Sequence, residues 1–300
     1  MTLTGSDVLL TEGSVVERLR RHPECTLDAH VAHAGFVYAP EPARILAGLY
    51  REYLDVAREA RLPILCFSPT WRANPERLQL AGLTEDANRD GVLFVRRIMA
   101  EYEAALLGGL MGCRGDAYRP EQALSTAEAA DFHASQAKAL ADAGCDFLYA
   151  STMPAASEAA GIAAAMGRTG APYLVSFIVT AQGALLDGTP IPDAIARIDE
   201  SVFPAPLGYM VNCVHPSIMA SALERCGSGP RSRILGLQAN TSSKSPTELE
   251  GSTHLETEDP ERFADSMLDL HQRFRLRILG GCCGTDARHI RALAARLVVR

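Results

Sequence analysis

The sequence contains no apolar run of the roughly 18 residues that a membrane-spanning helix requires. Its opening, MTLTGSDVLLTEGS, lacks the basic start and continuous apolar core of a secretory signal peptide. No low-complexity tract, internal repeat or change of composition marks a domain boundary. We therefore expect a cytoplasmic protein that forms a single domain over residues 1–300 and does not enter membranes. A homo-oligomer is compatible with the sequence.

An excess of basic residues is also absent. Lys and Arg number 29 against 36 Asp and Glu, which gives a formal net charge of −7. Such a surface repels the phosphate backbone of nucleic acids and slightly favours cationic small molecules. Hydrophobic residues make up 47% of the chain, which is enough for a large core. The composition predicts a globular protein with small-molecule partners and without a nucleic-acid partner.

The eight cysteines do not follow the paired CxxC spacing of a structural zinc finger. They are spread along the whole chain, whereas disulfide frameworks are found in short secreted domains. In a reducing compartment, such cysteines are free thiols or metal ligands.

Short apolar runs alternate with longer amphipathic stretches from end to end. Each run is nearly continuous in apolar residues, as expected for a strand covered on both faces. Eight such alternations predict the α/β class and a single (β/α)8 TIM barrel, with an open doubly wound sheet as the alternative. The eight strand candidates are Asp7–Thr11, Pro63–Thr70, Ala105–Met111, Asp146–Thr152, Tyr173–Thr180, Leu207–Cys213, Arg233–Asn240 and Arg275–Gly281.

Helix signals lie between the predicted strands. Pro42–Arg61 has an apolar face, and Thr126–Ala143 is expected to be one helix with Thr126 as its N-cap and Gly144 as its stop. The last helix is expected to begin at a Thr285–Asp286 cap. The polar segment Asn240–Asp259 has the composition of a loop inserted at the top of the barrel.

Three cysteines lie where a (β/α)8 barrel carries its functional residues, at the carboxyl ends of strands. Cys213 ends the run LGYMVNC, and Cys282 and Cys283 end the run RILGGCCG. Successive side chains of a strand point to opposite faces, so adjacent thiols can share a metal ion only after the strand has ended. The alternatives are core thiols or a strained vicinal disulfide. The other five cysteines are expected to be packing residues: Cys25, Cys66, Cys113, Cys145 and Cys226.

Three thiolates suit tetrahedral zinc, and a site with three protein ligands leaves one position open for a reactant. An open position is typical of catalytic rather than structural zinc. If Cys213, Cys282 and Cys283 converge, the sequence thus predicts Zn²⁺ as a cofactor.

Two motifs, NCVHP at Asn212–Pro216 and GGCCGTDARHI at Gly280–Ile290, resemble the homocysteine S-methyltransferase family. That family includes betaine- and S-methylmethionine-dependent enzymes and the homocysteine-binding module of methionine synthase. The stretches HASQAKALADAGCDFLYASTMPAASEA, APYLVSF and LLDGTPI extend the resemblance over almost the whole chain. It implies the barrel fold and assigns zinc to Cys213, Cys282 and Cys283.

The resemblance also implies an enzyme that moves a methyl group from a small sulfonium or quaternary ammonium donor to a zinc-bound thiolate. The acceptor is homocysteine, which becomes methionine, or a related thiol. Zinc removes the proton of a thiol whose free pKa is about 8.5, so the sulfur attacks without a general base. Two alternatives stay open: a component that works with a corrinoid or other partner protein, and a non-catalytic zinc- or thiol-binding homologue.

Around the expected metal site, the chain departs from the family pattern. Glu12 stands where members usually carry an Asp, and Ser151 stands where they usually carry a Glu that helps to hold the amino group of the substrate. Glu158 is near in sequence but is expected in the following helix. We therefore hypothesise that the acceptor thiol need not carry an α-amino group.

Six residues are substrate-binding candidates. Trp71 is either an aromatic wall against a cationic donor or a residue that packs on the barrel rim. Asn212 either donates to a cysteinate or substrate, or serves as a turn residue. The full set is Glu12, Trp71, Ser151, Thr152, Asn212 and Asn240.

Overall fold

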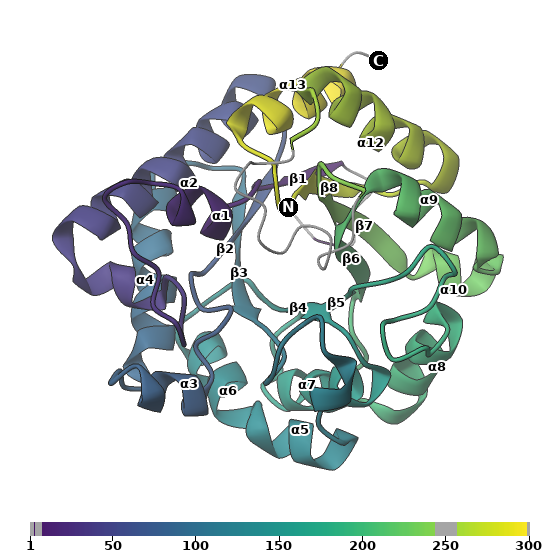
Figure 1. Ribbon diagram of the computed structural model, residues 1–300, viewed down its shortest axis with the longest axis horizontal. Helices are drawn as coiled ribbons and strands as arrows, with labels where there is room; N and C mark the ends of the chain where they lie inside the picture. Colours follow the sequence, from purple (N-terminus) through teal and green to yellow (C-terminus); the bar gives the residue numbers. More distant parts are fainter. Residues whose placement is uncertain (1–2, 4–7, 244–256, 299–300) are drawn as a thin grey trace.

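A computed structural model describes residues 3, 8–243 and 257–298. Eight parallel strands form a closed barrel in the order β1-β2-β3-β4-β5-β6-β7-β8, surrounded by helices (Figure 1). The prediction of a (β/α)8 TIM barrel is therefore confirmed. The strands are β1 Leu9–Thr11, β2 Ile64–Phe67, β3 Ala105–Met111, β4 Phe147–Met153, β5 Tyr173–Phe177, β6 Gly208–Val214, β7 Ile234–Ala239 and β8 Ile278–Gly281.

Every predicted run overlaps one of these strands, and β4 and β6 each extend one residue past the predicted end. The observed strands are mostly shorter than the predicted runs, because the apolar character continues into the loops at the barrel ends. The predicted first strand began at Asp7, which lies outside the described residues. Closure is direct: Leu9 of β1 pairs with Ile278 of β8, and Leu10 pairs with Leu279.

Helices and 3-10 turns connect successive strands and cover the outer face of the barrel (Figure 1). They are α1 Val16–Arg20, η1 Ala34–Tyr38, α2 Pro40–Ala60, α3 Pro75–Leu80, α4 Asp86–Met99, η2 Pro120–Gln122, α5 Thr126–Phe132, α6 Ala134–Asp142, α7 Ala156–Gly167, α8 Ile191–Ser201, α9 Pro216–Arg225, α10 Ser228–Ser232, α12 Pro260–Phe274 and α13 Ala287–Val298. Among the described residues, none of these helices is long and apolar enough to cross a membrane.

The predicted helix Thr126–Ala143 is wrong in two details. The chain forms two helices, α5 and α6, which meet at His133, whose imidazole turns inward to a buried carboxylate. The N-cap is Ser125, not Thr126, because Ser125 and Glu128 form a reciprocal capping box that satisfies the first free amides. Gly144 ends the segment with a φ of +83°, as predicted.

The prediction Pro42–Arg61 corresponds to α2, which begins two residues earlier at Pro40. Asp286 caps α13, as predicted, because its Oδ1 accepts the amide of Arg288 at 2.9 Å. Most of the predicted insertion Asn240–Asp259 lies outside the described residues.

Two apolar layers hold the barrel together. Large side chains fill its interior, among them Phe67 from β2 and Phe147 and Tyr149 from β4, the two strands that flank β3. The Phe67 and Tyr149 rings stack with centroids 4.7 Å apart. A second, larger cluster joins the outer faces of the strands to the helices. This packing leaves the loops after the carboxyl ends of the strands free to build a site.

Candidate metal centre

The three predicted ligands converge. The Sγ atoms of Cys213 and Cys282 lie 2.8 Å apart, and those of Cys213, Cys282 and Cys283 all lie within 4.8 Å of one another. All three side chains are half-buried. No other group of three or more His, Cys, Asp or Glu residues in the described part of the chain has this geometry.

Cys213 reaches the cluster through an irregularity in β6. Its φ of +58° is left-handed, and the pairing register with β7 shifts between Asn212 and Val214. Such a bulge re-aims a side chain and breaks the alternation of a regular strand. As a result, the Cys213 thiol reaches the Cys282 thiol, while the adjacent Asn212 side chain is buried between strands.

A second bulge lies on β4. Thr152 has a φ of +60°, and the register with β5 shifts between Ala150 and Met153. Asn212 joins the two bulges: its Oδ1 accepts the amide of Thr152 at 2.9 Å, and its Nδ2 donates to Thr152 Oγ1 at 2.6 Å. Ser176 also donates to Asn212 Oδ1, at 2.6 Å. The Asn212 amide thus braces both strand ends.

Cys282 and Cys283 follow β8 in a tight turn. The amide of Cys282 donates to Ala239 O at 2.7 Å, and the amide of Cys283 donates to Asn240 Oδ1 at 3.0 Å. A Cβ on Gly281 would lie 2.2 Å from Thr285 Oγ1, so only glycine fits at that position. Gly284 closes the turn with a φ of +82°. Asn240 therefore positions a cysteine of the cluster.

Further hydrogen bonds fix this turn to the start of the barrel. Thr285 Oγ1 donates to Cys282 O at 2.6 Å and accepts the amide of Ser14 at 3.1 Å. The carboxylate of Glu17, on α1, accepts the amide of Gly284.

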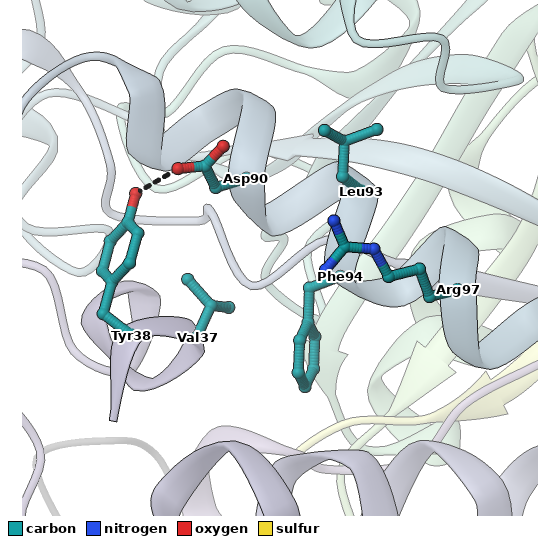
Figure 2. A pocket seen from close by; sticks show the side chains of 6 residues that line it. All are labelled: Val37, Tyr38, Asp90, Leu93, Phe94 and Arg97. Atoms are coloured by element: carbon teal, nitrogen blue, oxygen red, sulfur yellow. Dashed lines mark hydrogen bonds between the residues drawn. The ribbon is translucent and has the colours of Figure 1, made fainter. Parts of the chain in front are cut away.

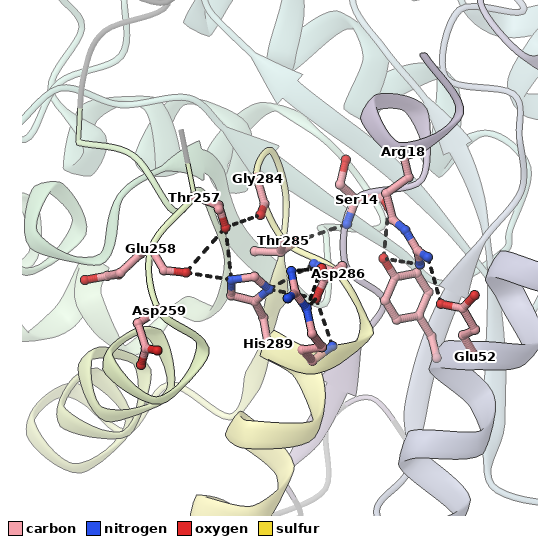
Figure 3. Close-up of polar contacts among 12 residues, drawn as sticks. Ser14, Arg18, Glu52, Thr257, Glu258, Asp259, Gly284, Thr285, Asp286 and His289 are labelled. Atoms are coloured by element: carbon pink, nitrogen blue, oxygen red, sulfur yellow. Dashed lines mark hydrogen bonds and ion pairs between the residues drawn. The ribbon is translucent and has the colours of Figure 1, made fainter. Parts of the chain in front are cut away.

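A network around His289 joins the turn to the segment that precedes α12 (Figure 3). His289 Nε2 lies 3.0 Å from Glu258 O and 3.3 Å from Thr257 Oγ1, while Nδ1 lies 3.0 Å from Asp286 Oδ1. Thr257 Oγ1 also donates to Gly284 O at 3.1 Å. Glu258 in turn lies 3.6 Å from Nε2 of His215, two residues after Cys213. This network links the loops that carry the thiols.

The thiols differ in acidity. The pKa of Cys213 is well below its ordinary value, because Cys282 and then Cys283 donate hydrogen bonds to its sulfur. The same hydrogen bonds raise the pKa of Cys282 and of Cys283, since their protons are held between sulfurs and a second negative charge would lie beside the first. The metal-free cluster thus concentrates one negative charge on Cys213, and a bound cation would favour ionisation of the other two thiols.

The donor set and spacing fit a thiophilic divalent metal ion. Tetrahedral zinc with bonds of about 2.3 Å to sulfur requires sulfurs roughly 3.8 Å apart. The observed separation of 2.8 Å and upper limit of 4.8 Å bracket this value, so small side-chain rotations suffice. The cluster can therefore hold a metal ion.

Glu12 is buried at the end of β1. Its Oε2 accepts the amide of Phe67 at 3.1 Å, and its carbonyl accepts the amide of Gly281 at 3.2 Å. Burial raises the pKa of Glu12 to about 8, and the hydrogen bond from Phe67 offsets part of this rise. Its carboxyl group is therefore mainly neutral at neutral pH.

Ser151 lies at the end of β4, with its Oγ 3.0 Å from Thr152 Oγ1. Trp71 is half-buried after β2, and its ring packs against Gly112. The Arg72 guanidinium lies over this ring, 5.7 Å from its centroid. The Trp71 ring therefore already has a cationic partner within the chain.

Sequence reasoning missed Tyr118, on the connection between β3 and α5. Its side chain lies beside Cys213, and the negative charge of the thiols raises the Tyr118 pKa. No local pattern marks this residue. The available signal was its position on a loop at the carboxyl end of a strand, where aromatic and polar residues merit inspection.

Glu158 does not replace a carboxylate at Ser151. It lies on α7, is 1% exposed, and is fully engaged with Arg114, Leu124 and His133.

A surface hollow of about 300 Å³ lies on the outside of the molecule, between η1 and α4 (Figure 2). Tyr38 donates to Asp90 Oδ2 at 2.9 Å across it. The hollow contains no residue from the end of a strand and lies apart from the chemistry of the thiols. Its lining consists of Val37, Tyr38, Asp90, Leu93, Phe94 and Arg97.

Comparison with known proteins identifies a matching family and two relatives. The family model described as homocysteine S-methyltransferase matches residues 9–297. Homocysteine S-methyltransferase of Escherichia coli (strain K12) is 25% identical over 315 aligned positions, which cover 98% of this chain and 96% of the relative. Homocysteine S-methyltransferase YbgG of Bacillus subtilis (strain 168) is 29% identical over 182 positions, which cover 60% of this chain but only 56% of the relative.

Solved structures agree with the fold. The oxidized form of the homocysteine methyltransferase MmuM from Escherichia coli superposes with a TM-score of 0.76 at 23% identity, covering 97% of this chain and 96% of that one. The metallated form of the same protein gives a TM-score of 0.74 at 22% identity, with the same coverage.

Proposed function

Because the chain belongs to the homocysteine S-methyltransferase family, we propose that it transfers a methyl group from a small sulfonium or quaternary ammonium donor to a thiol. The acceptor is homocysteine or a related thiol, and it binds beside Cys213, Cys282 and Cys283. The proposal covers residues 1–300 as a single domain. The observation that carries it is the convergence of these three sulfurs at the mouth of the barrel.

We propose Zn²⁺ as the cofactor held by the three cysteines. When bound there, it supplies a positive charge that keeps an incoming thiol ionised at neutral pH, so no side chain needs to act as a general base. The remaining work falls to the chain itself. Asn240 fixes the amide of Cys283, and Asn212 braces the β6 bulge, so both ligand-bearing segments are held before a substrate arrives.

The surroundings of the thiols bear on the choice of acceptor. Ser151 and Thr152 offer only hydroxyl groups, and Glu12 carries little charge at neutral pH. These residues pair weakly with an ammonium group. A charged carboxylate would favour thiols that carry an α-amino group. Because this site lacks one, we expect it to accept thiols without an α-amino group.

The first test is metal content. Purified protein is expected to contain about one zinc per chain, and Cys213→Ser is expected to lose most of it, because a ligand is removed. Cys66→Ala is the matched control, since Cys66 is a fully buried thiol on β2 and does not belong to the group of three clustered thiols. Equal zinc content in Cys213→Ser and wild type would contradict the proposed site.

The second test is turnover with a free donor. Homocysteine and a panel of other thiols are offered with S-methylmethionine or betaine and without any added protein. Methylated thiol is the expected product. Turnover that appears only after a corrinoid protein is added would support the partner-dependent alternative, and zinc binding without transfer from any donor would support a non-catalytic homologue.

A further inference from the structure

The connection between β3 and α5, residues 112–125, carries Tyr118 to the thiols. Its tip is internally ordered: the amide of Tyr118 donates to Asp116 Oδ1 at 2.9 Å, and the amide of Asp116 donates to Gln122 Oε1 at 3.1 Å. The Tyr118 side chain lies beside Cys213. Tyr118 itself is 37% exposed, so its side chain is accessible from solvent.

A single buried carboxylate holds both ends of the loop. Glu158 Oε1 accepts the amide of Arg114 at 2.7 Å, and Glu158 Oε2 accepts the amide of Leu124 at 3.2 Å. Glu158 lies in the first turn of α7 and is 1% exposed. Burying a carboxylate is costly unless it is hydrogen-bonded, so a carboxylate at this position depends on the loop as much as the loop depends on it.

His133 completes the arrangement. Its Nε2 lies 3.0 Å from Glu158 Oε1, and the ring is fully buried. Its Nδ1 has no hydrogen-bond partner among residues 3, 8–243 and 257–298, so pairing with the carboxylate places the proton on Nε2. His133 therefore fixes the orientation of Glu158 from the junction of α5 and α6.

We infer that Glu158, oriented by His133, is a positioning residue for the thiol site, which holds the 112–125 loop in the conformation that brings Tyr118 to Cys213. The inference rests on the proposed function and deepens it. A hydroxyl that donates to a thiolate draws negative charge from the sulfur. With Tyr118 in place, the cluster repels an incoming thiolate less, so the loop sets how tightly the acceptor binds.

The test uses the metal-loaded protein and three variants: Tyr118→Phe, Glu158→Gln and the double variant. Phenylalanine removes only the hydroxyl. The glutamine amide has only one acceptor oxygen, so either the Arg114 amide or the Leu124 amide loses its hydrogen-bond acceptor. Each single variant is expected to raise KM for the acceptor thiol by about tenfold, as befits one hydrogen bond to a charged group. The double variant is expected to match Tyr118→Phe, because Glu158 acts through Tyr118.

The control is Glu121→Gln, which removes a carboxylate from an exposed position in the same loop and should leave KM unchanged. A Glu158→Gln effect that multiplies with Tyr118→Phe would overturn the inference, because it would indicate a general structural role. A wild-type KM in Tyr118→Phe would overturn it as well, even if Glu158→Gln fails to fold.

A second readout does not need catalysis. Cobalt(II) bound to the cysteines gives thiolate charge-transfer absorption, which should shift equally in Tyr118→Phe and Glu158→Gln. If no donor supports turnover but this shift occurs, the proposed function fails while the positioning role stands. An unshifted spectrum in both variants would refute the positioning role whatever the activity.

Discussion

Replacing Glu12 with glutamine should change how the stability of the protein depends on pH. In the folded protein, burial raises the Glu12 pKa from 4.5 to about 8. Between these values the unfolded chain has released the Glu12 proton while the folded chain retains it. Stability contributed by the neutral buried acid is complete below pH 4.5 and is lost as the pH rises toward 8.

The magnitude follows from the shift. At 1.36 kcal/mol per pKa unit, the rise corresponds to about 5 kcal/mol in total and to about 2.7 kcal/mol between pH 5.5 and 7.5. Glutamine keeps an oxygen that can accept the amide of Phe67 but has no proton to lose. The free energy of unfolding of Glu12→Gln, relative to wild type, should therefore rise by about this amount over that interval.

The measurement is urea unfolding of both proteins at several pH values, with Thr11→Val as the control. Thr11 is the buried neighbour of Glu12 and carries no titratable group, so its effect should not vary with pH. If unfolding is irreversible, the infrared carbonyl band of a protonated carboxylic acid can be followed instead. A band that is absent in wild type at pH 6.5, or a flat difference between Glu12→Gln and wild type, would refute the reasoning.

Two further predictions concern the pocket and the metal. Asn240→Ala should weaken zinc binding by about tenfold to a hundredfold in a chelator competition, because the Cys283 amide loses its acceptor, and a wild-type affinity would contradict this role. Ser151→Glu should raise kcat/KM for homocysteine relative to a thiol without an amino group by about tenfold, since it adds a charge that pairs with an ammonium. Ser151→Gln, which adds the same length without the charge, should leave that ratio unchanged, and an unchanged ratio in Ser151→Glu would count against the argument.

The sequence was sufficient for the strands and for one half of the metal centre. Apolar runs and their alternation with helices are local properties, and so is the rule that adjacent thiols face one side only after a strand has ended. The Cys282–Cys283 turn obeys that rule, with the strand ending at Gly281. The glycines that permit the turn are visible in the sequence itself.

The other half of the centre was less accessible to sequence reasoning. Cys213 was predicted at the end of its strand, whereas β6 continues to Val214 and the thiol is presented by a bulge. A bulge depends on pairing between strands, which no local pattern encodes. The same limit hid Tyr118 and Glu158, because their roles arise from contacts between segments that are distant in the chain.

The two bulges are related in a way that bears on function. Thr152 and Cys213 both hold a left-handed φ without being glycine, which costs about 1–3 kcal/mol at each position. Such strain persists only where neighbouring contacts over-determine it, and the Asn212 amide holds Thr152 through two hydrogen bonds while Asn212 itself directly precedes Cys213 in the chain. One strained residue carries a thiol of the cluster, and the other adjoins Ser151, a candidate for acceptor binding. Asn212 therefore couples the geometry of the metal side to that of the acceptor side, so a change at either strand end should be felt at both.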